Sequence, residues 1–269
     1  MQTIMGRVHH LRQKEGLDDL LFLTIVVVAA IFLASCATSR QDRGRAASHV
    51  TMGTAYLGSG QSSQALREFL IAKQLSPHDP EIHYYAALAY YQNDMKAEAK
   101  KQLQATLSIN PDYSEAYTCL GTIYLEEGLY DRAIETFERA LSNMLYETPA
   151  IALNSIGWAY HNKGNYQTAL TKYETALRRE PNTVIRPLIQ QNRGITYLAE
   201  HDIDKAIYYL KQSIDSAPSR TEARYWLGIS YLEDGNRGKA IQELRLAVET
   251  NPESVFGLKA REKLDYLLR

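Results

Sequence analysis

Residues 114–149 read SEAYTCLGTIYLEEGLYDRAIETFERALSNMLYETP, and the order of residues in this stretch decides the fold. Gly121 is followed after three residues by Tyr124 and after twelve by Ala133, and a proline ends the stretch. The same order occurs six times along the chain, with 34–37 residues between successive small residues. The six small residues are Gly53, Ala87, Gly121, Gly157, Gly194 and Gly228; the tyrosines are Tyr56, Tyr90, Tyr124, Tyr160, Tyr197 and Tyr231; the alanines are Ala65, Ala99, Ala133, Ala169, Ala206 and Ala240.

Each unit predicts two amphipathic helices joined by a tight turn. The small residue of the first helix and the alanine of the second allow the two helices to approach closely, and a larger residue follows the alanine after four positions. These larger residues are Phe69, Leu103, Phe137, Tyr173, Leu210 and Leu244. One helix pair cannot bury its apolar face alone, so the units must stack. The sequence therefore predicts an all-α, right-handed superhelical solenoid of six repeats.

The ends of the helices are also marked in the sequence. We expect the first helix of each pair to end at a residue with left-handed backbone, a conformation that glycine adopts readily. These residues are Gly60, Asp94, Gly128, Gly164, His201 and Gly235. Proline cannot continue a helix, so we expect a proline to close the second helix of each pair. These prolines are Pro77, Pro111, Pro149, Pro181, Pro218 and Pro252.

The period divides most of the chain into units, with a further helix after the last one. The predicted units span residues 46–79, 80–113, 114–149, 150–186, 187–220 and 221–252. Residues 253–269 carry an apolar stripe at Phe256, Ala260, Leu264 and Leu267. This pattern favours a helix that covers the end of the solenoid, because arrays of repeats need a capping element. A free helix that binds a partner is the alternative.

The N-terminal residues have the pattern of a signal peptide. Basic residues precede the apolar run LLFLTIVVVAAIFLA at residues 20–34, which is shorter than the roughly 20 residues that a membrane-spanning helix needs. The run ends in Leu33-Ala34-Ser35-Cys36, which resembles a bacterial lipobox. We therefore expect residues 1–35 to be a signal peptide, Cys36 to carry acyl chains, and residues 36–45 to form a flexible lipidated tether. A signal-anchor helix with an incidental cysteine is the alternative.

Composition excludes several classes of function. The chain has 30 Lys and Arg against 31 Asp and Glu, whereas a nucleic-acid-binding protein needs clustered positive charge. No phosphate-binding, zinc-protease or nucleophile-elbow motif is found in the sequence. His49 and His83 occupy the same position of adjacent units and are interpreted as packing residues. We therefore predict a protein without enzymatic activity, cofactor, metal or small-molecule substrate.

The inner surface of the solenoid is the predicted binding site. Positions −3, +1 and +4 from the small residue form one stripe on the first helix of each pair. In the first two units this stripe predicts a largely apolar groove for a partner protein, formed by Val50, Thr54, Leu57, Tyr84, Leu88 and Tyr91. In the fourth unit it predicts a possible second site, formed by Asn154, Trp158 and His161. The alternative is that these residues only line the inside of the coil.

The repeat pattern resembles the tetratricopeptide repeat over about residues 46–252. With the lipobox and the lengthened junction before Pro149, it is similar to the PilF/PilW/Tgl family of type IV pilus lipoproteins, the pilotins. This resemblance implies a lipoprotein on the periplasmic face of the outer membrane, which binds the pilus secretin subunit and promotes its membrane targeting and multimer assembly, and so twitching motility. A periplasmic scaffold that docks cell-wall enzymes is the alternative. The partner, the oligomeric state and the roles of the extra residues at 141–150 and 180–187 stay open.

Overall fold

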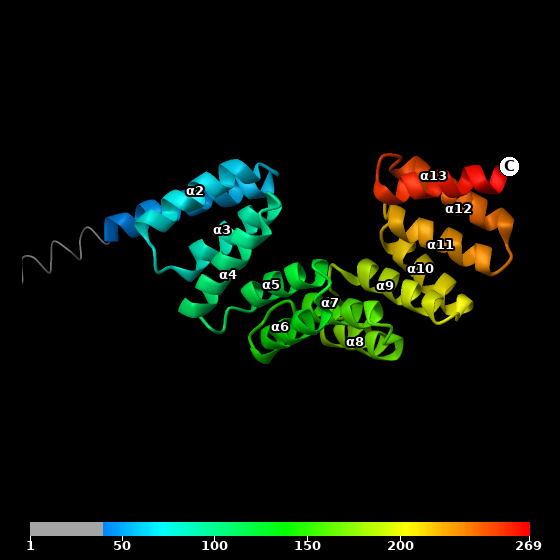
Figure 1. Ribbon diagram of the computed structural model, residues 1–269, viewed down its shortest axis with the longest axis horizontal. Helices are drawn as coiled ribbons and strands as arrows, with labels where there is room; N and C mark the ends of the chain where they lie inside the picture. The colour runs from blue at the N-terminus through cyan, green and yellow to red at the C-terminus, as the bar shows by residue number, and fades with distance from the viewer. Residues whose placement is uncertain (1–39) are drawn as a thin grey trace, which may run out of the picture. The chain divides into compact units, whose positions relative to one another are not determined.

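The computed structural model describes residues 40–269 (Figure 1), and the regular structure of this part is helical. Residues Leu33, Ala34, Ser35 and Cys36, and the apolar run before them, lie outside the described residues. The helices are an N-terminal helix described over residues 40–58, α2 (Ser62–Leu75), α3 (Pro80–Gln92), α4 (Lys96–Ile109), α5 (Ser114–Glu126), α6 (Tyr130–Ser142), α7 (Pro149–Asn162), α8 (Tyr166–Arg179), α9 (Arg186–Ala199), α10 (Ile203–Ser216), α11 (Thr221–Glu233), α12 (Arg237–Thr250) and α13 (Val255–Leu268). Of the helices in residues 40–269, none combines the length and hydropathy that crossing a lipid bilayer requires.

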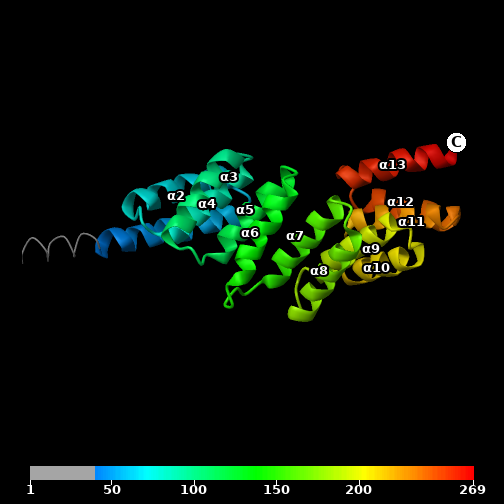
Figure 2. The same cartoon turned by 60° about the horizontal axis from the view of Figure 1, so that its bottom comes forward.

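These helices form the pairs that the sequence period predicts, which confirms the all-α repeat solenoid. The chain divides after Ala105, within α4, into two compact units, here called unit 1 and unit 2. In unit 2 the pairs α5–α6, α7–α8, α9–α10 and α11–α12 follow one another, and the second helix of each pair also packs on the first helix of the next (Figure 2). α13 packs against α11 and α12, in the position expected of a capping helix.

The small residue of each first helix makes room for the large residue of the second. A Cβ atom added to Gly53 would lie 2.5 Å from Cε1 of Phe69, and one added to Gly157 would lie 2.5 Å from Cε1 of Tyr173. At Gly194 the added atom would lie 2.6 Å from Cγ of Leu210. Real side chains do not approach so closely in a packed interior. The recurring small residue is therefore a requirement of packing between the two helices.

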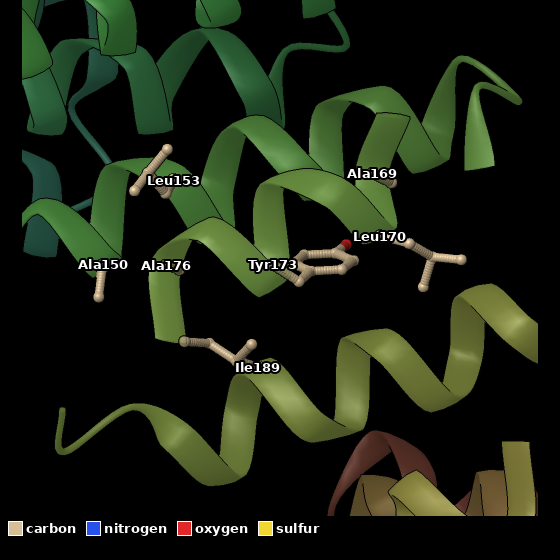
Figure 3. Close-up of a cluster of buried hydrophobic side chains, with 7 residues drawn as sticks. All are labelled: Ala150, Leu153, Ala169, Leu170, Tyr173, Ala176 and Ile189. Carbon is tan, nitrogen blue, oxygen red and sulfur yellow. The ribbon is translucent and has the colours of Figure 1, made fainter. Parts of the chain in front are cut away.

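The interior of unit 2 is continuous from one helix pair to the next. Figure 3 shows one of its clusters, in which the ring of Tyr173 lies among side chains from three consecutive helices. The members are Ala150 and Leu153 of α7, Ala169, Leu170, Tyr173 and Ala176 of α8, and Ile189 of α9. Because α9 belongs to the next pair, this cluster joins neighbouring repeats as well as the two helices of one repeat.

The predicted left-handed residues are confirmed at all six positions. Gly60, Gly128, Gly164 and Gly235 have φ angles of 73–77°. Asp94 and His201 have φ angles of 59° and 60° and are the non-glycine residues with positive φ among residues 40–269. The period thus identifies these turns even where the residue is not glycine.

Two features of the sequence interpretation need correction. Pro149 does not close the third unit: α6 already ends at Ser142, and Pro149 is the first residue of α7. A proline fits this position because the first N–H of a helix has no partner within it. The five other prolines each follow the end of a second helix after two residues. The fifth unit is predicted to begin at residue 187, and its first helix, α9, begins one residue earlier, at Arg186.

The second correction concerns the predicted tether at residues 36–45. Residues 40–45 are helical and belong to the N-terminal helix. Asp42 and Arg45 form an ion pair one turn apart, with 3.5 Å between Oδ1 and Nη1. Ala46 is buried against Ala72 and Ile82, which fixes the helix at this point. The packed helix therefore continues toward the N-terminus beyond the first complete repeat, and residues 36–39 lie outside the described residues.

Candidate binding site

A hollow of about 250 Å³ lies on the first helices of consecutive repeats in unit 2, and we call it the Trp158 hollow. Four helices contribute to it, all of them the first helix of their pair. Its lining consists of Leu125 of α5, Asn154, Ser155 and Trp158 of α7, Leu188, Gln191 and Asn192 of α9, and Glu222 of α11. The site therefore spans four repeats and exists only because these repeats stack.

Helical spacing explains how α7 and α9 supply most of this lining. Asn154 and Trp158 are four residues apart and so lie on the same face of α7. Gln191 occupies in α9 the position that Asn154 occupies in α7, three residues before the recurring small residue of the repeat. The second predicted site is thus brought together with residues of the next repeat, which the sequence interpretation did not include.

A pair of buried amides forms the floor of the Trp158 hollow. Asn192 Nδ2 donates a hydrogen bond to Asn154 Oδ1 over 3.0 Å, and both side chains are buried. This bond uses one donor of Asn192 and the oxygen of Asn154. The remaining amide nitrogen of Asn154 and amide oxygen of Asn192 provide a donor and an acceptor, which is the complement of a peptide group.

Neighbouring polar contacts hold this floor in place. Arg220 Nε donates to Gln191 Oε1 over 3.0 Å, which fixes the orientation of the Gln191 amide. Burial lowers the pKa of Arg220, although its guanidinium stays charged at neutral pH. Gln191 is buried, so its carbonyl oxygen needs this partner. The hollow therefore offers fixed amide groups rather than mobile side chains.

The imidazole ring of His161 stacks against the indole of Trp158. The two rings stack with 4.6 Å between their centroids and 4° between their planes. Thr196 Oγ1 donates to the carbonyl oxygen of Asn192, so it must accept the hydrogen bond from His161 Nδ1, which is 3.0 Å away. Burial lowers the pKa of His161, so the ring is neutral at neutral pH with its proton on Nδ1. This bond fixes the ring on which the indole rests.

The six groove residues predicted in unit 1 have a different setting. All six are partly buried. Val50 packs against the cluster of Ala46, Ala72 and Ile82, and Leu57 packs against the cluster around Phe69. Thr54 donates a hydrogen bond to the Thr51 carbonyl, and the ring of Tyr84 lies 5.5 Å from that of Tyr85. Val50 and Leu57 therefore contribute to helix packing, while the binding role of Val50, Thr54, Leu57, Tyr84, Leu88 and Tyr91 stays a prediction.

Several residues of the Trp158 hollow were not predicted from the sequence. Ser155 and Asn192 lie two residues before the small position of their repeats, and Leu188 and Glu222 lie six residues before it. These two offsets lie on one helix face, next to the face used for the prediction. Widening the predicted stripe to offsets −2 and −6 would have named these positions, but not which of them meet in one hollow. Among residues 40–269, no group of three or more His, Cys, Asp or Glu side chains is arranged to hold a metal ion.

Sequence comparison defines the class of protein to which these repeats belong. Profiles of the tetratricopeptide repeat match residues 50–99, 112–182 and 197–262. The matched segments fall on the helix pairs of both units. The chain therefore belongs to the tetratricopeptide-repeat family, whose members are modules of protein–protein interaction.

Individual relatives share this fold. The structure of PilF from Pseudomonas aeruginosa superposes with a TM-score of 0.69 and 15% identity, over 83% of this chain and 99% of PilF. PilW, described as a widely conserved type IV pilus biogenesis factor, superposes with a TM-score of 0.72 and 18% identity, over 80% of this chain and 98% of PilW. In sequence, anaphase-promoting complex subunit 3 from Schizosaccharomyces pombe is 25% identical to this chain over 70% of the chain's length. The aligned segment covers only 27% of the length of that protein.

Proposed function

We propose that this protein is an outer-membrane lipoprotein that binds the type IV pilus secretin subunit and promotes its membrane targeting and assembly into multimers. The likeness to PilF and PilW supports the proposal, because it extends over almost the whole of both proteins. The lipobox-like residues before Cys36 support attachment to a membrane from the periplasmic side.

The Trp158 hollow is the observation that carries the binding role. Its amide floor can pair with the backbone of an extended segment, and the indole of Trp158 can cover an apolar side chain of that segment. Glu222 also lines the hollow and interacts with the charge of Arg220, so this part of the site holds one acidic and one basic group. Acyl chains on Cys36 would keep the hollow near the membrane and so raise the local concentration of bound subunits.

Replacing Trp158 tests this role. We expect Trp158→Ala together with Asn154→Ala to weaken binding of the purified secretin subunit by about thirtyfold or more, because truncating a central interface residue typically costs at least about 2 kcal/mol. The affinity of the purified repeats, without acyl chains, for the secretin subunit is measured by calorimetry. The amount of secretin multimer is measured in membranes of cells that carry each variant. Tyr266→Ala is the matched control, because Tyr266 is an exposed aromatic residue of α13 that does not line the Trp158 hollow.

Two results would contradict the proposal in different ways. Unchanged secretin binding by the double variant, with a native circular dichroism spectrum, would remove the Trp158 hollow from the contact. In that case Leu57→Glu with Tyr84→Ala tests the groove predicted in unit 1. No binding of secretin by the unmodified chain would reject the secretin role itself. Affinity capture that enriches cell-wall enzymes instead would support the alternative of a periplasmic scaffold.

A further inference from the structure

Two junctions between repeats expose large aliphatic side chains to solvent. The exposed fractions are 97% for Met144, 87% for Leu145 and 91% for Val184. Met144 and Leu145 lie between α6 and α7, and Val184 lies between α8 and α9. The corresponding junctions at residues 110–113, 217–220 and 251–254 read NPDY, APSR and NPES and carry no aliphatic residue larger than alanine or proline. The exposure is thus specific to the two lengthened junctions.

The first junction is held so that Met144 and Leu145 project outward. Asn143 Nδ2 donates to the Asp112 carbonyl and to Ser114 Oγ, both over 3.0 Å, and Asn143 Oδ1 accepts a hydrogen bond from the Leu145 N–H over 2.9 Å. On the other side, the Tyr146 hydroxyl lies 2.9 Å from Thr118 Oγ1, and this ring is buried. These hydrogen bonds anchor both flanks of the tip, and between them Met144 and Leu145 are 97% and 87% exposed.

The second junction lies next to the first. Glu180 Oε2 accepts a hydrogen bond from the N–H of Ala150, which connects the end of α8 to the start of α7. Arg179 and Met144 line the same hollow of about 280 Å³, together with Tyr146 and Pro149. In a stacked array all junctions of this kind lie along one edge. We call the edge formed by residues 143–148 and 180–185 the junction edge.

Arginines surround the junction edge. Arg139, Arg178 and Arg179 lie in the last turns of α6 and α8, and Arg186 is the first residue of α9. All four are exposed. The acidic residues within the two junctions are Glu147 and Glu180, and Glu180 accepts a hydrogen bond from the Ala150 N–H. Asp112 and Glu115 lie beside the first junction. The edge therefore combines projecting aliphatic tips with four exposed arginines, against two glutamates within the junctions themselves.

We propose that the junction edge rests on an anionic phospholipid surface. Met144, Leu145 and Val184 would enter the boundary between headgroups and acyl chains, and the arginines would lie at the lipid phosphates. Nearly complete exposure favours a lipid surface over a peptide, because residues that bind a peptide usually form the floor of a groove and keep part of their surface covered. This inference is independent of the secretin role, which uses the Trp158 hollow.

A tryptophan placed at the tip tests the proposal. The full chain carrying Leu145→Trp is reconstituted into vesicles of phosphatidylcholine with one third phosphatidylglycerol, and the acyl chains of the lipids are brominated to quench an inserted indole. Ser219→Trp is the matched control, because Ser219 lies exposed in a junction of the same kind that has no aliphatic tip. Both variants share the same N-terminal attachment, so only the position of the new indole differs.

We expect clear quenching and a blue-shifted emission for Leu145→Trp, and the background of the two native tryptophans for Ser219→Trp. Arg178→Gln with Arg179→Gln, or vesicles of phosphatidylcholine alone, should abolish the quenching at position 145. Equal quenching of Leu145→Trp and Ser219→Trp in the anionic vesicles overturns the proposal. The proposal is also overturned if the indole at position 145 becomes buried only when protein molecules associate in the absence of lipid. That result would assign the junction edge to a protein contact.

Discussion

At the scale of single residues, the contact between a glycine and a larger side chain determines how closely two helices pack. In the N-terminal helix, Gly53 faces the ring of Phe69, whereas an added Cβ at Gly58 would have no atom within 4 Å apart from the adjoining backbone of its own helix. Phe69 is fully buried among Ala65, Ala86 and Ala89, so its ring cannot move aside without disturbing the next repeat. The same residue type thus has two different functions within one helix.

Replacing these two glycines separates packing from backbone entropy. We expect Gly53→Ala to lower the free energy of unfolding by about 1–3 kcal/mol, because the methyl group overlaps the Phe69 ring. Gly58→Ala should raise it by about 0.5–1 kcal/mol, because alanine loses less entropy than glycine in a helix. Urea denaturation followed by circular dichroism measures both. A neutral Gly53→Ala would show that the ring can shift and that the small residue is not required.

The residue scale also shows where the sequence is informative about the candidate site. Asn154 and Trp158 could be predicted to share one face because they lie four residues apart on a single helix. Their partners on α9 could not, since the angle between successive helix pairs decides which stripes meet in one hollow. Similarly, the period identifies the left-handed turns at Asp94 and His201, whereas the role of Pro149 depends on where the preceding helix stops.

At the scale of elements, α13 shows how the array ends. Ser254 caps its first turn by accepting a hydrogen bond from the Gly257 N–H over 3.0 Å. Ala260, Leu264 and Leu267 then pack against Leu244 and Ala247 of α12. The sequence stripe predicts this helix because its apolar positions follow the helical period. It does not predict the polar anchors of the 143–148 junction, which depend on contacts between different repeats.

The capping role of α13 can be measured with two leucines. Leu264→Ala should lower the free energy of unfolding by about 2–5 kcal/mol, because it leaves a cavity against α12. Leu258→Ala is the control, because Leu258 is 47% exposed on the same helix and should change stability by less than about 0.5 kcal/mol. Urea denaturation of both variants gives the comparison. Similar losses for the two would argue that α13 is not packed as a cap and favour the free partner-binding helix.

At the scale of the whole molecule, the two cysteines have separate roles. Cys36 is the predicted acylation site, whereas Cys119 lies inside α5. Burial, with a smaller contribution from Glu126, raises the pKa of Cys119 to about 12, so its thiol stays protonated and unreactive at neutral pH. Membrane attachment should therefore depend on one cysteine only.

Labelling with a radioactive fatty acid tests this dependence. We expect Cys36→Ser to prevent acylation while the helical content seen by circular dichroism stays the same, because the described repeats begin after this residue. A radiolabelled fatty acid should be incorporated into the unmodified chain and into Cys119→Ser, but not into Cys36→Ser. Incorporation into Cys36→Ser would contradict the lipobox interpretation. Retention of the apolar run at residues 20–34 in the mature unmodified protein would favour the signal-anchor helix.

The N-terminal helix is described from residue 40 onward, which limits how far the repeats can lie from an acylated Cys36. Only residues 37–39 lie between the two points, and a chain extends by at most about 3.6 Å per residue. The start of the helix would then stay within roughly 15 Å of the acylated residue. With so short a connection, the distance of unit 1 from the lipid surface would be determined by the angle between the N-terminal helix and that surface, rather than by the length of a linker.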